Sequence, residues 1–557
     1  MPSGGWPARE SARPVLASPD PPAWDRETDV LVVGSGGAGY TTALFAQRLG
    51  HEALILEKAD RIGGTTLKTG GWYWVPNNSL MRALGHEDSR EDAIRYMARL
   101  SRPTLYDPED ARFGLPEDEH ALIAAFYDHG AAAIDTLGEM GALASAIGAG
   151  VPDYYAQIPE NRQVYGRVLY PLKPDGEPAR AGGGVEMVRQ LDEAARARGI
   201  EVLTSHRVQR LVMDASGRVR GVEASDGEGR TVRVGARDGV VFASGGFVHD
   251  AELRRNFLSD PVFSGCGAYA NEGDLVHIAG AAGAAFRNMN YAWMCPLPFE
   301  WAVARRPDLS GVFTVPGDSM IFVNKLGRRT ANEKAPYNEL ARAFFRWDAF
   351  RGEYPDYLMF MIYDDRCASL WAGNDYGNVI PPEGANDAHV VRGATLEELE
   401  RALGERLARY GALTSGVRLE PGWAAAVARS VERFNGFARA GADLDFHRGA
   451  SPIEPVFNGP GRGEKVGDPT MFPISTEGPW HCVILVGGAL DTKGGPKVDL
   501  GGRILDVDRQ PIPGLYGAGN CVASPSGRAY WAGGGTLGPI FTFAYLTAEA
   551  IHVDSTG

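Results

Sequence analysis

The chain has 557 residues, more than one ordinary hydrophobic core accommodates, and its 44% hydrophobic and 23% charged residues are typical of a globular protein. The net charge of −14 argues against nucleic-acid binding, which needs a basic surface, and no apolar run of about 18 residues predicts a membrane span. The 72 glycines are nearly twice the usual share of about 7%, which indicates loops that approach a large ligand closely.

The cysteines and the N-terminal residues indicate the compartment. The five cysteines are scattered, without a CxxC pair or a zinc-type spacing, so we predict no metal site and a reduced, cytoplasmic protein. Residues 1–27 are rich in Pro, Ser and Ala and lack the apolar core of a signal peptide. We expect them to form a flexible extension that packs loosely or not at all.

Residues 29–58 combine a strand, a glycine loop, a helix and a second strand. The first strand runs into Gly34-x-Gly36-x-x-Gly39, and the second, "ALILE", ends in Glu57. In such a βαβ unit the first glycine makes the tight turn, the second admits a pyrophosphate and the third lets the helix pack on the strand. Glu57 lies 18 residues past Gly39, near the usual distance for a carboxylate that accepts hydrogen bonds from a ribose. We therefore predict that these residues bind the adenosine diphosphate half of a dinucleotide.

A second glycine-rich loop, "KADRIGGTTLKTGG", follows Glu57 directly. An NAD enzyme would continue with further strand–helix repeats, whereas flavoproteins use such a loop to run the backbone along the rest of the cofactor. With these motifs the chain resembles the fumarate reductase and 3-ketosteroid dehydrogenase superfamily of FAD enzymes, from residue 28 over nearly its whole length. The stretch Thr65–Thr69 lacks the histidine that carries the flavin in some members, so the resemblance implies non-covalent FAD.

The resemblance implies an α/β architecture, in which a Rossmann-type, glutathione-reductase-like FAD-binding domain carries an inserted α+β catalytic cap domain. From about residue 288 the composition shifts toward aromatic, proline and charged residues, as expected for such an insert. The expected divisions are a flexible extension over 1–27, the first FAD-binding segment over 28–287, the cap over 288–449 and the second FAD-binding segment over 450–557.

Further cofactor contacts follow from the same similarity. The backbone at Val208 is expected to meet the adenine, and a glycine turn at Gly245 follows the return strand. A last glycine turn leads into a long helix whose positive N-terminus would face the flavin pyrimidine. Besides the glycine loop and Glu57, the expected FAD contacts are Ala38, Lys58, Gly63, Gly64, Thr65, Thr66, Gly70, Gly71, Val208, Gly245, Gly519, Asn520, Gly535, Thr536 and Leu537.

The resemblance also implies a catalytic base. In fumarate reductases the proton donor is an arginine five residues after the asparagine of an "NE" pair, which here is Asn332-Glu333 in "GRRTANEKAPYNEL". The fifth residue is Tyr337, as in the 3-ketosteroid dehydrogenases, so Tyr337 is expected to remove the proton α to a ketone while flavin N5 accepts a hydride from the β carbon. Forming a tyrosinate at pH 7 costs about 4 kcal/mol without help.

Residues 528–539, "RAYWAGGGTLGP", carry the Tyr-x-x-x-Gly arrangement of the 3-ketosteroid Δ1-dehydrogenases. By that similarity the Tyr530 hydroxyl and the Gly534 N–H donate hydrogen bonds to the ketone oxygen and form an oxyanion hole. A tyrosine of "GVPDYYAQIPENR" would assist the base. Tyr154 is preferred for this role and Tyr155 is the alternative.

Other residues near these motifs have two readings. The tryptophans Trp72, Trp74 and Trp531 either narrow the substrate pocket or belong to the core. Lys334 is either a solvated loop charge, the preferred interpretation, or a cation that favours a nearby phenolate. Arg448 belongs either to a surface ion pair or to the remnant of a carboxylate clamp.

The implied function is FAD-dependent α,β-dehydrogenation of a cyclic ketone, as in the 3-ketosteroid Δ1-dehydrogenases of steroid or alicyclic-ring catabolism. The alternatives are the desaturation of a smaller ketone, of the cyclohexanone or 4-oxocyclohexanecarboxylate type, and an enone or enoate reduction of the fumarate-reductase type. The electron acceptor, whether a quinone, oxygen or a redox protein, stays open at this point.

Overall fold

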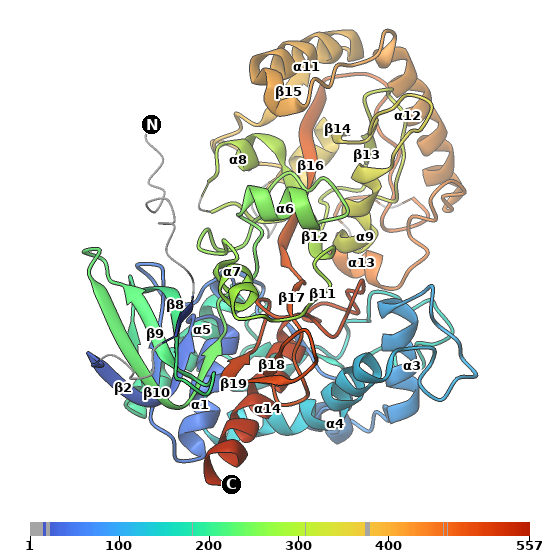
Figure 1. The fold of residues 1–557 in the computed structure, drawn as a ribbon. Helices are drawn as coiled ribbons and strands as arrows, with labels where there is room; N and C mark the ends of the chain where they lie inside the picture. The colour runs from blue at the N-terminus through green and yellow to red at the C-terminus, as the bar shows by residue number, and fades with distance from the viewer. Residues whose placement is uncertain are drawn as a thin grey trace.

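The computed structural model describes residues 15–17, 23–180, 182–306, 308–373, 379–459, 462–464 and 466–557. Two sheets organise the molecule: a nine-stranded sheet, low in Figure 1, and a five-stranded sheet above it. A three-stranded and a two-stranded sheet accompany them.

The nine-stranded sheet consists of β1 Val15–Ala17, β2 Arg26–Val33, β3 Ala53–Leu56, β7 Glu201–Leu203, β8 Arg207–Met213, β9 Val219–Ser225, β10 Thr231–Phe242, β18 Arg503–Leu505 and β19 Pro511–Gly517. Its centre is parallel, because β19, β10, β2, β3 and β7 pair in that order and in one direction. Val30, Leu31 and Val32 are fully buried, as expected for parallel strands that are covered on both faces.

Helices cover both faces of this sheet. On one face α1 (Gly37–Arg48), α5 (Gly183–Ala197) and α14 (Leu537–Thr556) share a core with β2 and β3. On the other face the apolar side chains of α7 (Asp274–Ala281) pack with those of β8 and β10. This layering confirms the predicted α/β, Rossmann-type fold.

One part of the expected N-terminal extension is packed. Strand β1 pairs in parallel with the end of β8, so that Val15 lies beside Leu211. The prediction that this extension packs loosely or not at all is therefore wrong for 15–17. Residues 1–14 and 18–22 lie outside the described residues.

The five-stranded sheet is antiparallel and consists of β12 Ala292–Pro298, β13 Met320–Val323, β14 Leu358–Asp364, β15 Val390–Gly393 and β16 Trp480–Thr492. Strand β16 pairs with β12, β14 and β15, and Figure 1 shows it running from the upper sheet toward the lower one. The expected boundary at 449/450 would assign this central strand to the FAD-binding domain. We propose instead that the chain returns to that domain after Thr492.

The helices around the five-stranded sheet are α8 Phe299–Val303, α9 Tyr337–Arg342, α10 Asp365–Leu370, α11 Leu396–Tyr410, α12 Trp423–Ala440 and α13 Ile453–Asn458. The three-stranded sheet contains β4 Tyr73–Trp74, β5 Ser145–Ile147 and β6 Val168–Pro171, and the two-stranded sheet contains β11 Phe286–Arg287 and β17 Gly495–Pro496. The remaining helices are α2 Ser79–Ala83, α3 Arg90–Ser101, α4 Glu117–Glu139 and α6 Ala251–Phe257, with 3₁₀ turns at Thr66–Lys68, Ala343–Phe345 and Gly411–Thr414.

Candidate active site

A cavity of about 500 Å³ opens at the carboxyl ends of β2, β3 and β10, where an open parallel sheet usually binds its ligand. It lies between the two glycine loops, the segment 268–271 and the turn at 519–520. The expected cofactor contacts that line it are Gly34, Gly36, Ala38, Glu57, Lys58, Gly64, Thr65, Thr66, Val208, Gly245, Gly519 and Asn520.

The first glycine loop has the geometry that the motif requires. Gly34 has φ +109°, and a Cβ there would lie 2.5 Å from the carbonyl oxygen of Ala243. A Cβ on Gly39 would lie 1.8 Å from the carbonyl oxygen of Gly34, so the helix approaches the strand only without a side chain. Gly36 is different, since its Cβ would meet nothing closer than 3.8 Å and the residue lines the cavity. The predicted role of Gly36, to leave space for a pyrophosphate, stays a prediction.

Glu57 ties the two loops together. Its carboxylate accepts hydrogen bonds from the Ser35 N–H at 2.9 Å, the Ser35 hydroxyl at 2.7 Å and the Ala59 N–H at 2.8 Å. The predicted contact of Glu57 with a ribose stays a prediction. Lys58 lines the same cavity, but its ammonium pairs with Glu272 at 2.9 Å and Asp274 at 2.8 Å.

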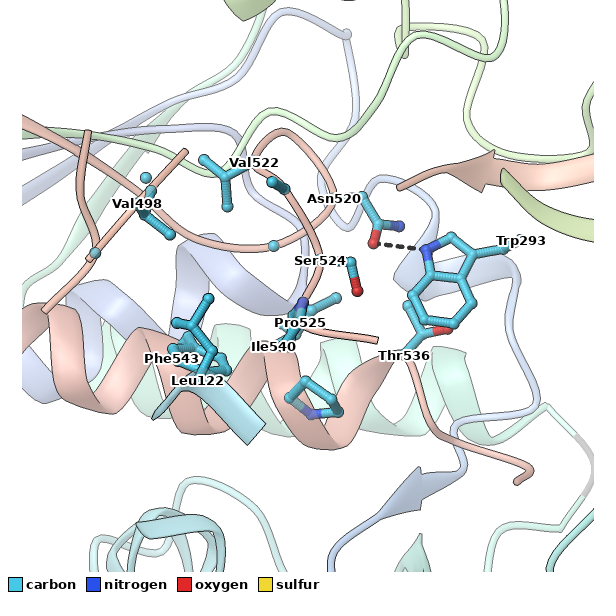
Figure 2. A pocket seen from close by; sticks show the side chains of 15 residues that line it. Leu122, Trp293, Val498, Asn520, Val522, Ser524, Pro525, Thr536, Ile540 and Phe543 are labelled. Atoms are coloured by element: carbon cyan, nitrogen blue, oxygen red, sulfur yellow. Dashed lines mark hydrogen bonds between the residues drawn. The ribbon is translucent and has the colours of Figure 1, made fainter. Parts of the chain in front are cut away.

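Some expected cofactor contacts do not line this cavity. Gly70 and Gly71 pack against the start of α5, where a Cβ on Gly71 would lie 2.2 Å from the backbone of Gly183. Thr536 lines a smaller neighbouring pocket, shown in Figure 2, which shares Asn520 with the large cavity. The other residues of this group are Gly39, Gly63, Gly535 and Leu537.

The cavity fits FAD in shape and in polar groups. Six glycines line it, and the buried Ser244 hydroxyl, which also lines it, has only the weakly bonding Cys521 thiol as a side-chain partner among the described residues. A bound cofactor would supply a stronger partner. Ser244, Asn271 and Asp491 were not predicted from the sequence, because no spacing rule connects them to the glycine motif.

Asp491 is a buried carboxyl at the cavity wall. It accepts hydrogen bonds from the Gly246 N–H at 3.0 Å and from the side-chain amides of Asn271 at 2.8 Å and Asn520 at 3.2 Å. Burial raises its pKa to about 6, although these donors act in the opposite direction. Asp491 thereby joins three segments of the cavity wall.

Three tyrosines that are far apart in the sequence meet in one buried core cluster. This cluster reaches the cavity through Trp293, whose ring packs on Tyr530 and whose indole N–H donates to Asn520 of the cavity wall. The ring centroids of Tyr154 and Tyr337 lie 5.6 Å apart, those of Tyr154 and Tyr530 5.5 Å apart, and those of Tyr337 and Tyr530 5.2 Å apart. Each side chain is between 2% and 6% exposed. We call these three residues the tyrosine cluster. Tyr155 is not one of them, and its hydroxyl bonds to Glu339. The preference for Tyr154 as the assisting tyrosine stays a prediction.

The environment of the tyrosine cluster opposes ionisation. Burial raises the pKa of Tyr337 well above its ordinary value, and the neighbouring Tyr154 and Tyr530 raise it further. Burial also raises the pKa of Tyr530, although a hydrogen bond with Tyr337 works against that shift. In the ligand-free protein Tyr337 therefore keeps its proton.

Gly534 lies directly beside β4. It has φ +88°, and a Cβ would lie 2.5 Å from the backbone nitrogen of Tyr73, so only glycine fits. Its carbonyl accepts a hydrogen bond from the Trp74 N–H at 3.0 Å, while its own N–H has no acceptor among the residues that the structure describes. This leaves one oriented backbone donor free for a ligand.

An aromatic block lies behind the cluster. Trp74 and Trp531 are fully buried with ring centroids 5.6 Å apart, and the Trp531 carbonyl accepts hydrogen bonds from the Tyr96 hydroxyl at 2.6 Å and the Tyr154 N–H at 3.2 Å. Both tryptophans are therefore core residues. The ring of Trp72 lies against the loop, because a Cβ on Gly533 would meet it at 2.4 Å.

An ion network supports the segment that carries Tyr154. The Arg167 guanidinium binds Asp88 at 2.7 Å and Asp153 at 2.6 Å, and these side chains are at most 1% exposed. The Trp74 indole N–H donates to the other oxygen of Asp153 at 2.6 Å. Burial raises the pKa of Asp153 to about 6 despite this pairing. Asp153 directly precedes Tyr154, so the network positions that part of the backbone.

Two basic residues near the "NE" turn are buried rather than solvated. Lys334 is 1% exposed and donates to the Val315 carbonyl, and burial lowers its pKa to about 7. Arg448 is 2% exposed and donates to Glu333 at 3.2 Å, to the Met320 carbonyl at 2.8 Å and to two further carbonyls. The expectation that Lys334 and Arg448 lie at the surface is wrong. Both side chains are buried inside the cap, where polar groups of the protein surround them.

The fold and the cavity define a dinucleotide-binding flavoprotein, and comparison with known proteins agrees. The chain matches the FAD binding domain family over residues 29–537 and belongs to that family. It is an FAD-dependent oxidoreductase acting on CH–CH groups.

Two relatives match it over nearly full length. The chain is 31% identical to the 3-oxosteroid 1-dehydrogenase of Mycolicibacterium smegmatis, over 94% of this chain and 97% of the relative. It is 29% identical to the 4-oxocyclohexanecarboxylate 2-dehydrogenase of Sinomonas cyclohexanicum, over 95% and 93%.

A solved structure is also similar throughout. The 3-ketosteroid delta1-dehydrogenase from Sterolibacterium denitrificans, in complex with 1,4-androstadiene-3,17-dione, has a TM-score of 0.80 at 25% identity and covers 95% of this chain and 100% of that one. Within the described part of the chain, no helix has both the length and the apolar character that a membrane crossing requires.

Proposed function

We propose that the protein catalyses the FAD-dependent α,β-dehydrogenation of a cyclic ketone, in the manner of the 3-ketosteroid Δ1-dehydrogenases. The observation that carries this proposal is the convergence of three buried tyrosine rings, together with a Gly534 N–H that has no acceptor among the described residues. One of these rings, Tyr530, packs on Trp293, which donates to Asn520 of the cavity wall. FAD, when bound non-covalently, would supply the acceptor for the hydride that leaves the β carbon.

The Tyr530 hydroxyl and the Gly534 N–H would hold the ketone oxygen. Both donors are fixed before the ketone arrives, Gly534 by β4 and Tyr530 by the surrounding rings. Preorganised donors stabilise an enolate oxygen without reorganisation, and each is worth roughly 3–4 kcal/mol at best.

Tyr337 would remove the proton α to the ketone. Its raised pKa, to which Tyr154 contributes, means that it reaches the basic form only at a cost. The acidified α proton would reduce that cost, and Tyr154 would assist only by turning its hydroxyl to donate a hydrogen bond to the phenolate. The activity should therefore rise with pH from neutral into the alkaline range.

The substrate would be a six-membered ring ketone, since the rings named in 3-oxosteroids and 4-oxocyclohexanecarboxylate share that group. A 3-ketosteroid is our leading candidate. The smaller ketone is the second candidate, and the position of Trp72 over Gly533 favours it by limiting the space beside the loop.

A reduction of the fumarate-reductase type has less support. Such chemistry needs arginines that clamp a carboxylate. Tyr337 stands where that mechanism needs an arginine, and the donors of Arg448 are used by Glu333 and by backbone carbonyls. An unsaturated carboxylate that reoxidises the reduced enzyme, with no ketone able to reduce it, would support this alternative.

The test is anaerobic mixing of the FAD-loaded enzyme with 3-ketosteroids and with 4-oxocyclohexanecarboxylate, followed by flavin absorbance. We expect one of these ketones to bleach the flavin, and we expect Tyr530→Phe to slow bleaching by about 10²–10³-fold. Tyr165→Phe is the matched control, because Tyr165 is 39% exposed. Bleaching of Tyr530→Phe at the wild-type rate would refute the role of Tyr530.

A further inference from the structure

Lys493 is a buried cation directly behind the loop that carries Tyr530. The side chain is fully buried, and its Nζ donates to the Ala529 carbonyl, to the Arg528 carbonyl at 3.3 Å and to the Ser526 hydroxyl at 3.4 Å. No carboxylate oxygen among the described residues lies within 4.0 Å of this Nζ. The ammonium is thus held by neutral groups alone.

Such a position is unfavourable for folding stability, because an ammonium loses its hydration without gaining an ion pair. Burial lowers the pKa of Lys493 well below its ordinary value. The nearby Arg342 and Arg528 act in the same direction, and Glu339 acts against it. The contacts of Lys493 therefore point to a role other than stabilisation.

The same Nζ also fixes the ring that supports Tyr530. It lies 3.7 Å from the ring centroid of Trp293, a cation–π contact in a dry environment. The indole N–H of Trp293 donates to Asn520 at 3.1 Å, as Figure 2 shows. The ring centroid of Tyr530 lies 4.8 Å from that of Trp293, in an edge-to-face arrangement. Lys493 thus contacts both the peptide group that precedes Tyr530 and one of the rings that pack against it.

We infer that Lys493 is a positioning residue that aims the Tyr530 hydroxyl, by holding the Ala529 carbonyl and the Trp293 ring together. This inference rests on the proposed function, in which Tyr530 donates a hydrogen bond to the ketone oxygen. A small displacement of that hydroxyl lowers turnover, because misplacement by about 1 Å costs up to about 10²-fold in rate.

The first experiment replaces Lys493 in the full-length, FAD-loaded enzyme. Lys493→Met keeps the length of the side chain and removes the charge. We expect kcat to fall by about 10–100-fold, while the FAD content stays the same and the unfolding midpoint is equal or higher. Lys497→Met is the control, since Lys497 lies on the same segment and pairs with Asp118 at 3.0 Å. A purely structural role would instead lower the unfolding midpoint and the FAD content.

A double-mutant cycle separates the inference from the proposed function. If Lys493 acts through Tyr530, Lys493→Met has no further effect on kcat in the Tyr530→Phe background. A Tyr530→Phe enzyme that is slow, and that Lys493→Met slows again by the full factor, would overturn the inference and leave the proposed function intact. Wild-type turnover of Tyr530→Phe would refute the proposed role of Tyr530 in holding the ketone oxygen.

A third experiment tests the inference without measuring activity, so its result holds whether or not the proposed function is correct. The holoenzyme is labelled with 3-fluorotyrosine, and the fluorine resonance of residue 530 is assigned by its loss in Tyr530→Phe. We expect Lys493→Met to shift or broaden that resonance and Lys497→Met to leave it unchanged. An unchanged resonance in Lys493→Met would overturn the inference.

Discussion

The cofactor cavity and the tyrosine cluster are adjacent, yet they are built in opposite ways. The cavity is lined by loops that include two short glycine-rich stretches, and it holds about 500 Å³ of open space. The tyrosine cluster consists of side chains from three distant segments that pack ring against ring. Backbone groups are suited to binding a large cofactor that is the same in every turnover. Proton transfer instead needs side chains whose pKa is tuned by their surroundings.

The two supports of the tyrosine cluster differ as well. Behind Tyr154, the charge of Arg167 is matched by two buried carboxylates. Behind Tyr530, the charge of Lys493 is matched by none among the described residues. Loss of the first support should therefore appear as lost stability, and loss of the second as lost turnover.

The largest expected effect comes from the cavity. Gly39→Ala would put a Cβ 1.8 Å from the Gly34 carbonyl oxygen, so β2 and α1 must separate. We expect a loss of more than about 4 kcal/mol in the free energy of unfolding and a protein that purifies without yellow colour, as measured by urea denaturation and absorbance. Gly404→Ala, in the middle of α11 where a Cβ meets nothing within 4 Å, should be neutral or stabilise by up to about 1 kcal/mol. Yellow, stable Gly39→Ala would contradict this account of the loop.

Removing the buried cation behind Tyr154 comes next. Arg167→Met leaves Asp88 and Asp153 buried without a countercharge, and we expect it to cost about 3–5 kcal/mol of the free energy of unfolding. Urea denaturation measures the change. Arg162→Met serves as the control, because its side chain is 69% exposed and lies 3.5 Å from Asp92. Equal stability of the two variants would show that the network is not a support.

Changing the proposed base should affect turnover rather than cofactor binding. We expect Tyr337→Phe to lower kcat by about 10²–10⁴-fold with the flavin spectrum intact. In the wild-type enzyme the raised pKa of Tyr337 means that the basic form becomes more abundant as pH rises, so kcat/KM should increase about tenfold per pH unit from neutrality. That dependence should vanish in the variant. If it persists, the base is another group.

The smallest expected effect concerns Asp491 and pH. Its pKa of about 6 in the folded state lies above the unfolded value of about 3.9, so the folded state holds the proton more tightly. The stabilisation is complete below about pH 4 and is lost as pH rises to about 6. Relative to Asp491→Asn, the wild type should lose at most about 3 kcal/mol of unfolding free energy across this range, as measured by urea denaturation. Asp60→Asn, with a side chain 76% exposed, should show no such difference from the wild type.

The cofactor-binding unit could be predicted from the spacing of residues that are close together in the sequence. A strand, a Gly34-x-Gly36-x-x-Gly39 loop and Glu57 lie within one short stretch, and the steric demands of that unit act between near neighbours in the chain. The glycine loop and Glu57 were predicted from this pattern, whereas the α/β architecture and the other residues of the cavity were predicted from the resemblance. Tyr337, Tyr530 and Tyr154 were found through their motif positions, and nothing in their own spacing required them to meet.

The sequence by itself determined the FAD-binding unit, because its geometry depends on backbone sterics between adjacent residues. Only the tertiary structure decided that β16 belongs to the cap sheet, that Arg448 and Lys334 are buried, and that Lys493 lies behind Tyr530. These positions depend on contacts between segments hundreds of residues apart. Burial then decides the chemistry of each group, since the cost of removing a charge from water depends on what surrounds it and not on which residues precede it.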